Sequence, residues 1–397
     1  MIIYLYTAVF VLLLTECNAG MFQLCGQNSI NGRSEKRRSF KEYNVDDLNY
    51  VGDHVTFACV VSMLQSGFYI GRTNGSVPEN LIEKLDISGR GLSLFFHGVG
   101  NFISLKDGFL FQFAREWFTA SGNNICIVSY AYTTNPTVGL KIVPHLNKMV
   151  TTNRLEYVAK LARDLVLGVR EKCVQSNRKS CLKSLSQVDV SGFSFGAHVA
   201  GRTCEFLYQK TGQRVRMLLA LDPSKTIPFF GTKPTNTIKR GHASYVQVIH
   251  TSVFGIREPL GDVDIYVKYK GESFVDDLND KHAMGAYFHV ATATKRLYVI
   301  ADEKDSGNGT LIFAHGNVRK PKPSECVVGV YGTLNPFIEG KKFVVSLKNR
   351  TDLFWSALDK FSGHEIFFEE YNPKPSEEED KRKEDNKGRK DSPKSTR

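Results

Sequence analysis

The sequence predicts an α/β protein, with a largely parallel central sheet and helices on both of its faces. Apolar runs of strand length recur along the chain, and segments with helical spacing of apolar residues lie between them. This alternation of strands and helices is typical of a parallel sheet. Hydrophobic residues make up 42% and aromatic residues 11% of the 397 residues, which is enough to build a packed core.

The expected elements follow one another between Leu92 and Ile249. The strand candidates are residues 92–96, 125–132, 188–191, 217–221 and 245–249, and the helix candidates are residues 109–119, 155–169 and 195–208. The second helix is amphipathic, because its apolar side chains recur at helical spacing and form one stripe. No internal repeat is visible in the sequence.

The two ends of the chain differ in composition from its body. Ile2–Leu14 is an apolar run of 13 residues, which is the length of a signal-peptide core and falls short of the roughly 20 residues that span a bilayer. Small residues at Cys17 and Ala19 predict cleavage after Ala19, and an uncleaved membrane anchor is the alternative. Residues 374–397 contain nine Lys or Arg and seven Asp or Glu, a composition typical of a disordered tail. We therefore expect a secreted, extracellular protein with a signal peptide over 1–19, one folded domain over 20–373 and a charged tail over 374–397.

The charge balance is basic, with 52 Lys and Arg against 41 Asp and Glu and a formal net charge of +11. Such a balance suits anionic lipid, glycan or nucleic acid. The sequence carries no RNP, zinc-finger or helix-turn-helix signature, so nucleic acid is not an expected partner.

The cysteines predict disulfides and no metal site. Cleavage after Ala19 leaves seven, an odd number, so at least one thiol has no partner within the chain. Cys173 and Cys181 close a short loop and form the expected bridge, and Cys25 with Cys59 is a second possible pair. Cys126 lies in an apolar run, where a buried thiol is expected.

Three sequons of the form N-x-S/T predict N-glycosylation at Asn74, Asn308 and Asn349.

The sharpest motif is the stretch G-F-S-F-G at residues 192–196, where a predicted strand meets a predicted helix. In that context G-x-S-x-G is a nucleophile elbow, because Gly192 and Gly196 permit a tight turn that presents the Ser194 hydroxyl at a helix N-terminus. A serine nucleophile needs a base and a carboxylate that orients the base. In α/β-hydrolases these follow in the order Ser, Asp, His, which makes Asp222, at the end of the next strand, the expected acid. An ordinary turn aspartate before Pro223 is the alternative.

Four motifs in order resemble those of the secreted animal lipases of the pancreatic lipase type. That family carries G-H-S-L-G-A-H, then L-D-P, then V-x-V-I-H-T, then G-H-x-D-x-Y/F. The segments here are G-F-S-F-G-A-H at 192–198, L-D-P at 221–223, V-Q-V-I-H-T at 246–251 and G-D-V-D-I-Y at 261–266. Phe96-His97-Gly98 looks like the family's H-G oxyanion segment. The resemblance, from about Leu92 to His282, implies an α/β-hydrolase fold and a serine esterase.

The resemblance also implies the remaining site residues. The family's base follows its lid in a C-x-H-x-R context before a helix, and that position here is His282, although the flanking Cys and Arg are absent. His289 is the second candidate for the base, whereas the histidines at 97, 198 and 250 occupy motif positions that are structural in the family. The family's oxyanion donors, two backbone N–H groups, map to Val99 and Phe195.

The segment before the predicted base is short. Only 15 residues separate Tyr266 from His282, and Lys268–Asp280 is polar, whereas triacylglycerol lipases of the family have a disulfide-bounded lid of some two dozen residues. In this respect the sequence resembles the phospholipase A1-type members, which have reduced lids, and it is also similar to lidless lipase homologues of some avian viruses. Between Ser356 and the tail there are too few residues for the family's C-terminal β-sandwich, so no colipase-type partner is expected.

We therefore expect a secreted serine carboxylic-ester hydrolase that acts on glycerolipids, with phospholipid favoured over triacylglycerol. It would contact lipid surfaces peripherally and need neither a cofactor nor a metal. The rival hypothesis is a catalytically silent lipase fold that binds lipid or a protein partner, as in yolk-type relatives of the family. The unusual context of His282 and the charged tail favour this rival, and the intact order of Ser194, Asp222 and His282 counts against it.

Overall fold

The computed structural model describes ten parts of the chain, and these parts form one sheet with its covering helices. They are residues 54–99, 108–130, 149, 152–176, 178–225, 237–269, 278–303, 307–313, 319–348 and 351–358. The predicted signal peptide and charged tail lie outside these residues, as do Cys25 and Asn349. Within the described parts, none of the helices has the length and hydropathy to span a bilayer.

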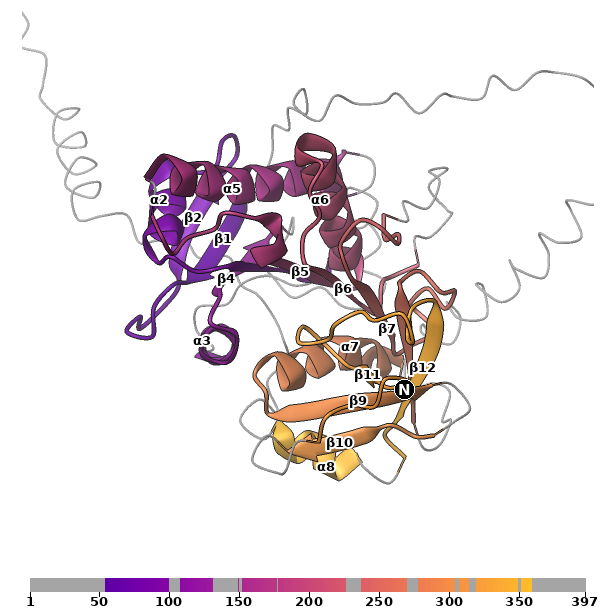
Figure 1. Ribbon diagram of the computed structural model, residues 1–397. Coiled ribbons are helices and arrows are strands. Elements are labelled where there is room, and N and C mark those ends of the chain that lie inside the picture. The colour runs from indigo at the N-terminus through magenta and orange to yellow at the C-terminus, as the bar shows by residue number, and fades with distance from the viewer. Residues whose placement is uncertain are drawn as a thin grey trace, which may run out of the picture.

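The sheet runs through the whole described structure, in the order β10-β9-β12-β8-β7-β6-β5-β3-β4-β1-β2, with β11 paired to β9 (Figure 1). The strands are β1 Val55–Val60, β2 Tyr69–Thr73, β3 Leu92–Phe96, β4 Asn124–Ser129, β5 Val188–Phe193, β6 Met217–Leu221, β7 Val246–His250, β8 Val263–Lys268, β9 Leu297–Glu303, β10 Thr310–Phe313, β11 Cys326–Val327 and β12 Lys341–Ser346. All neighbours from β4 to β12 across the centre pair in parallel. Antiparallel strands extend the sheet at both edges. The predicted α/β class is confirmed.

Helices cover both faces of the sheet, and each set packs on its own apolar layer (Figure 1). One layer includes residues of α2 Glu79–Ile87, α5 Arg154–Ser176 and α6 Phe195–Thr211. The other includes residues of α3 Gly108–Ser121, α7 Leu278–Ala293 and α8 Thr351–Ala357. Strand β3 shows the reason, since its successive side chains alternate between the two faces: Leu94 and Phe96 join the first layer and Phe95 the second.

The observed disulfides correct part of the cysteine prediction. The expected bridge between Cys173 and Cys181 is confirmed, with the two Cα atoms 5.6 Å apart. Cys59, however, pairs with Cys126, so the proposed Cys25–Cys59 bridge and the free thiol at Cys126 are wrong. The cause is strand β1, which the sequence did not predict: it lies antiparallel to β4 and places Cys59 directly opposite Cys126.

Candidate active site

The nucleophile elbow has the strained geometry that its motif predicts. Ser194 lies between the end of β5 and the start of α6, with a φ of 56° and a ψ of −121°. A positive φ is rare for a residue other than glycine, and such strain clusters at functional sites. The Ser194 N–H donates a hydrogen bond of 2.9 Å to the carbonyl oxygen of Leu221, which ties the turn to the end of β6.

The turn requires glycine at both Gly192 and Gly196, because neither position has room for a side chain. A Cβ atom on Gly192 would come within 2.7 Å of the backbone nitrogen of Ala197. One on Gly196 would come within 2.7 Å of the carbonyl carbon of Phe96, in the strand that leads to the H-G segment. The elbow is therefore packed directly against β3 and against the first turn of α6.

Ser194, His282 and Asp222 form one continuous chain of hydrogen bonds. The Nε2 atom of His282 lies 2.8 Å from the Ser194 hydroxyl oxygen, and its Nδ1 atom lies 2.6 Å from Oδ2 of Asp222. An ionised carboxylate can only accept, so Nδ1 carries the proton and Nε2 is free to take one from the serine. The structure places His282 inside α7 rather than before a helix, which corrects the expected local context.

The carboxylate of Asp222 is fully buried at the end of β6 and is held by several donors. Its Oδ1 accepts hydrogen bonds from the N–H groups of Thr251 and Ser252, at 2.8 and 3.1 Å, and its Oδ2 accepts the Ser252 hydroxyl and His282. Burial acts to raise the pKa of Asp222, but the hydrogen bonds from His282, Ser252 and Thr251 outweigh it and leave the pKa below its usual value. Asp222 is therefore ionised at neutral pH.

Two aromatic rings border the imidazole of His282. The Phe193 ring centroid lies 4.9 Å from that of His282, and the Phe254 centroid lies 6.0 Å from it in an edge-on orientation. The His282 side chain keeps 20% of its surface exposed to solvent. Phe193 is the first variable position of the elbow motif, whereas no sequence signal pointed to Phe254.

The predicted oxyanion donors lie on two segments that touch. Phe195 is the first residue of α6, so its N–H is one of those that lack a partner within the helix, at the positive end of the helix dipole. Val99 is buried in the turn after β3. The contact between Gly196 and the backbone of β3 joins the two segments.

His97 holds the turn that carries Val99. Its Nδ1 atom lies 2.6 Å from the carbonyl oxygen of Gly98, and its Nε2 accepts a weak hydrogen bond of 3.4 Å from the N–H of Tyr130. The Tyr130 hydroxyl donates to the carbonyl oxygen of His97, and the two rings stack with centroids 4.6 Å apart. Burial lowers the pKa of His97 to about 4, against a smaller opposing effect of the Gly98 carbonyl. His97 is therefore uncharged at neutral pH and has a structural role in this turn.

The other histidines make contacts away from the Ser194 hydroxyl. His289 is fully buried, and its ring is stacked on that of Phe95 and lies edge-on to that of Trp117, with the His289 and Trp117 ring centroids 4.7 Å apart. Burial lowers the pKa of His289 to about 3. The Nε2 of His198 donates to the carbonyl oxygen of Ser224 at 2.8 Å. His250 lies 2.9 Å from Asp264, which links the third and fourth motifs.

Of the predicted glycosylation sites, Asn74 and Asn308 are both exposed at the surface. Asn349 lies outside the described residues. A possible metal-binding group, formed by Asp86, Cys173 and Cys181, is already occupied by other interactions. Its two cysteines form a disulfide, and Asp86 lies 3.3 Å from Arg178.

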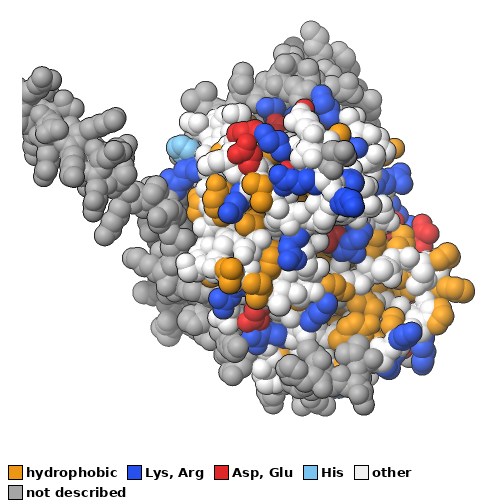
Figure 2. All heavy atoms as spheres, turned by 60° about the vertical axis from the view of Figure 1, so that its left-hand side comes forward, with side chains coloured by type: hydrophobic (Ala, Val, Ile, Leu, Met, Phe, Trp, Pro, Cys, Tyr) orange, Lys and Arg blue, Asp and Glu red, His pale blue; other side chains and the backbone are white. Residues whose placement is uncertain are grey.

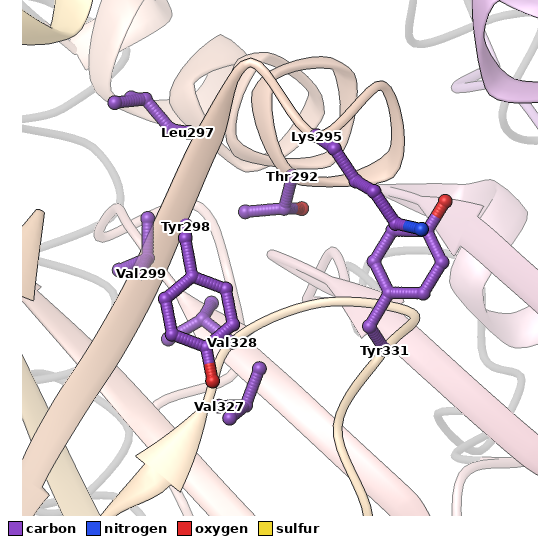
Figure 3. Close-up of a pocket in the computed structure, with 8 residues that line it drawn as sticks. All are labelled: Thr292, Lys295, Leu297, Tyr298, Val299, Val327, Val328 and Tyr331. Carbon is purple, nitrogen blue, oxygen red and sulfur yellow. The ribbon is translucent and has the colours of Figure 1, made fainter. Parts of the chain in front are cut away.

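A cavity of about 260 Å³ lies at the far end of α7 from the triad (Figure 3). Its walls are mostly apolar side chains of β9 and of residues 327–328, with Lys295 and Tyr331 at one edge. Thr292 in the cavity wall lies ten positions after His282 along α7, and at 1.5 Å per helical residue this corresponds to roughly 15 Å. The cavity is thus separate from the candidate active site.

Comparison with known proteins supports the family resemblance that the motifs predicted. Residues 159–274 match the model of the Lipase family, and they contain the elbow, Asp222 and strands β5 to β8. Lipase member H of Rattus norvegicus is 32% identical over 127 residues, which cover 32% of this chain and 27% of that protein. Phospholipase A1 member A of Pongo abelii is 28% identical over 179 residues, which cover 45% of this chain and 34% of that protein.

A third relative is named as a vitellogenin and not as a lipase or phospholipase. Vitellogenin-2 of Ceratitis capitata is 35% identical over 83 residues, which cover 20% of this chain and 19% of that protein. The aligned segments therefore span between a fifth and about a third of the length of these three relatives. The fold, a mostly parallel sheet with flanking helices and a nucleophile elbow, is that of an α/β-hydrolase, and the family match and the relatives are consistent with the pancreatic lipase family.

Proposed function

We propose that this protein is a serine carboxylic-ester hydrolase that acts on glycerolipids. The observation that carries the proposal is the hydrogen-bonded chain from Ser194 through His282 to Asp222, with distances of 2.8 and 2.6 Å. This geometry fits a serine nucleophile, its base and the carboxylate that orients the base. The match to the Lipase family supports a lipid ester as the substrate.

In the proposed reaction, Ser194 Oγ attacks the ester carbonyl carbon while Nε2 of His282 takes the hydroxyl proton. The carbonyl oxygen becomes an oxyanion, which the N–H groups of Val99 and Phe195 stabilise. The imidazolium, held by Asp222, then gives its proton to the leaving alcohol, and an acyl-enzyme remains. Water attacks this intermediate with His282 again as the base, and the fatty acid leaves.

Phospholipid is the proposed substrate class rather than triacylglycerol. The 15 residues between Tyr266 and His282 are too few and too polar for a lid with a broad apolar face. The relative named phospholipase A1 member A supports the same assignment. Basic side chains spread over one face of the molecule, with few acidic ones among them, would favour peripheral contact with anionic lipid surfaces (Figure 2).

The proposed setting is the extracellular space, reached through a signal peptide over 1–19, with the catalytic domain over 20–373 and a charged tail over 374–397. The two disulfides support an oxidising compartment. Glycosylation at Asn74, Asn308 and Asn349 belongs to the same proposal, and the first two side chains are exposed. No cofactor, metal or colipase-type partner enters the proposed reaction.

A catalytically silent lipid- or protein-binding role is the second candidate. The relative named vitellogenin-2, 35% identical over 83 residues, favours it. The assembled triad favours the hydrolase instead, because a binding protein has no need of a base within 2.8 Å of a strained serine.

Hydrolysis assays on purified protein test the proposal. We expect the wild-type protein to cleave a short-chain ester and a dispersed phospholipid, the phospholipid faster than triacylglycerol, and Ser194→Ala to cleave none of them above background. Equal rates for the wild type and Ser194→Ala would refute the role of Ser194. Preference for triacylglycerol, with a sharp rise in rate above its solubility limit, would refute the substrate class alone.

A further inference from the structure

A serine outside the triad contacts the triad carboxylate directly. Ser252 follows β7 and is almost fully buried, with 8% of its surface exposed. Its hydroxyl donates to Oδ2 of Asp222, the same oxygen that accepts Nδ1 of His282, and its own N–H donates to Oδ1 at 3.1 Å. One residue therefore holds both oxygens of the carboxylate.

The surroundings of the Ser252 hydroxyl assign its hydrogen-bonding role. The oxygen accepts the N–H groups of Phe254 and Gly255, at 3.1 and 3.3 Å. It also lies 3.4 Å from Nδ1 of His282, an atom that already carries a proton bound to the carboxylate. Because N–H donors face the lone pairs of the Ser252 hydroxyl oxygen, the hydroxyl proton is donated to the Asp222 carboxylate.

The turn that carries Ser252 is fastened to the strand end that carries Asp222. The N–H of Lys225 donates to the carbonyl oxygen of Phe254 at 2.9 Å, and the N–H of Ile256 donates to that of Pro223 at 2.8 Å. Gly255 completes the fit, because a Cβ at this position would lie 2.8 Å from Cγ of Asp222. The hydroxyl is thus held rigidly relative to the carboxylate.

We propose that Ser252 is a positioning residue, whose hydroxyl fixes the rotation of the Asp222 carboxylate so that Oδ2 faces the imidazole of His282. This inference rests on the proposed hydrolase function, since the orientation matters only if His282 acts as a base. By sharing Oδ2 with His282, the hydroxyl also weakens the carboxylate's attraction for the imidazolium. Its removal should therefore shift the acid limb of the pH–rate profile to higher pH.

The test compares Ser252→Ala with Ser252→Thr, which keeps the hydroxyl, and with Ser224→Ala as the matched control. Ser224 lies two residues after Asp222, and its hydroxyl has no hydrogen-bond partner among the described residues. For Ser252→Ala we expect kcat to fall between about 10- and 100-fold with KM nearly unchanged, because a hydrogen bond to a charged group is lost. The acid limb should move to higher pH, Ser252→Thr should recover most of the rate, and Ser224→Ala should match the wild type.

A second readout does not depend on activity. The low-field proton resonance of the His282–Asp222 hydrogen bond should shift or broaden in Ser252→Ala and stay in place in Ser224→Ala. Unchanged kcat and resonance in Ser252→Ala would overturn the proposal. So would a loss of rate with an unmoved acid limb, or a Thr variant as impaired as Ala, because either outcome assigns Ser252 a role in folding only. If the wild type cleaves no ester, the hydrolase function fails, while the resonance still decides whether Ser252 orients Asp222.

Discussion

Replacement of Asp222 by asparagine would separate the geometry of the triad from its charge. Two backbone N–H groups face Oδ1, so the variant Asp222→Asn would place its amide oxygen at that position, where an acceptor is needed. The amide nitrogen would then occupy the place of Oδ2, where it faces Nδ1 of His282 and the Ser252 hydroxyl.

An amide N–H opposite Nδ1 forces the imidazole into the other tautomer. Nδ1 must then accept, and the proton moves to Nε2, which points at the Ser194 hydroxyl 2.8 Å away and can no longer take its proton. The same substitution in a serine protease triad lowers kcat about 10⁴-fold, and we expect a loss of that order, about 5.5 kcal/mol of transition-state stabilisation.

The assay is the steady-state hydrolysis of a short-chain ester by the wild type and Asp222→Asn at neutral pH. Circular dichroism and the thermal midpoint serve as controls, because the amide keeps the size of the buried group. A loss of less than about tenfold in a folded variant would refute the assignment of Asp222 as the orienting carboxylate, and with it the tautomer deduced for His282.

Three further predictions concern stability and membrane binding. Burial lowers the pKa of His289 from 6.5 to about 3. Between these two pH values the imidazole therefore stays neutral in the folded protein, whereas it takes up a proton in the unfolded chain. Stability should therefore be full above pH 6.5 and fall below it by up to about 1.4 kcal/mol per pH unit, and urea unfolding of His289→Gln should show a flatter dependence. The Cys59–Cys126 bridge spans 67 residues and the Cys173–Cys181 bridge spans 8. Because a longer closed loop restricts the unfolded chain more, replacing Cys59 and Cys126 by Ala should lower the free energy of unfolding by about 2 kcal/mol more than replacing Cys173 and Cys181, as measured by urea unfolding. Binding of the protein to anionic vesicles, measured by sedimentation, should be weaker at high salt than at low salt, because salt screens the attraction between opposite charges. Binding that does not depend on salt would exclude an electrostatic contact.

The centre of the sheet and the elbow were predictable because their signals are local. Strands β3 and β6 appear as short apolar runs, and the residues around Ser194 form a motif whose turn requires glycine on both sides. Asp222, the proposed acid, could be predicted from chain order and from the end of β6. His282, the proposed base, followed from the family resemblance, although its helix begins earlier than expected.

Features that depend on distant parts of the chain were not predictable in this way. The pairing of Cys59 with Cys126 depends on an edge strand that lies antiparallel to β4, and neither strand encodes its neighbour locally. The contact of Ser252 with Asp222 arises because the ends of β6 and β7 lie side by side in the sheet. The T-S pair after His250 could have drawn attention to this position, but only the fold reveals its partner.

Ser194 is the proposed nucleophile, and His282 is the residue that would activate it. The most direct test of these roles is covalent labelling with a fluorophosphonate, followed by mass spectrometric mapping of the modified peptide, because this reagent requires an activated serine. We expect one adduct on Ser194 in the wild type, none in Ser194→Ala and strongly slowed labelling in His282→Gln, with His289→Gln close to the wild type. Folded wild-type protein that resists the reagent, or an adduct on another serine, would contradict the proposed role of Ser194.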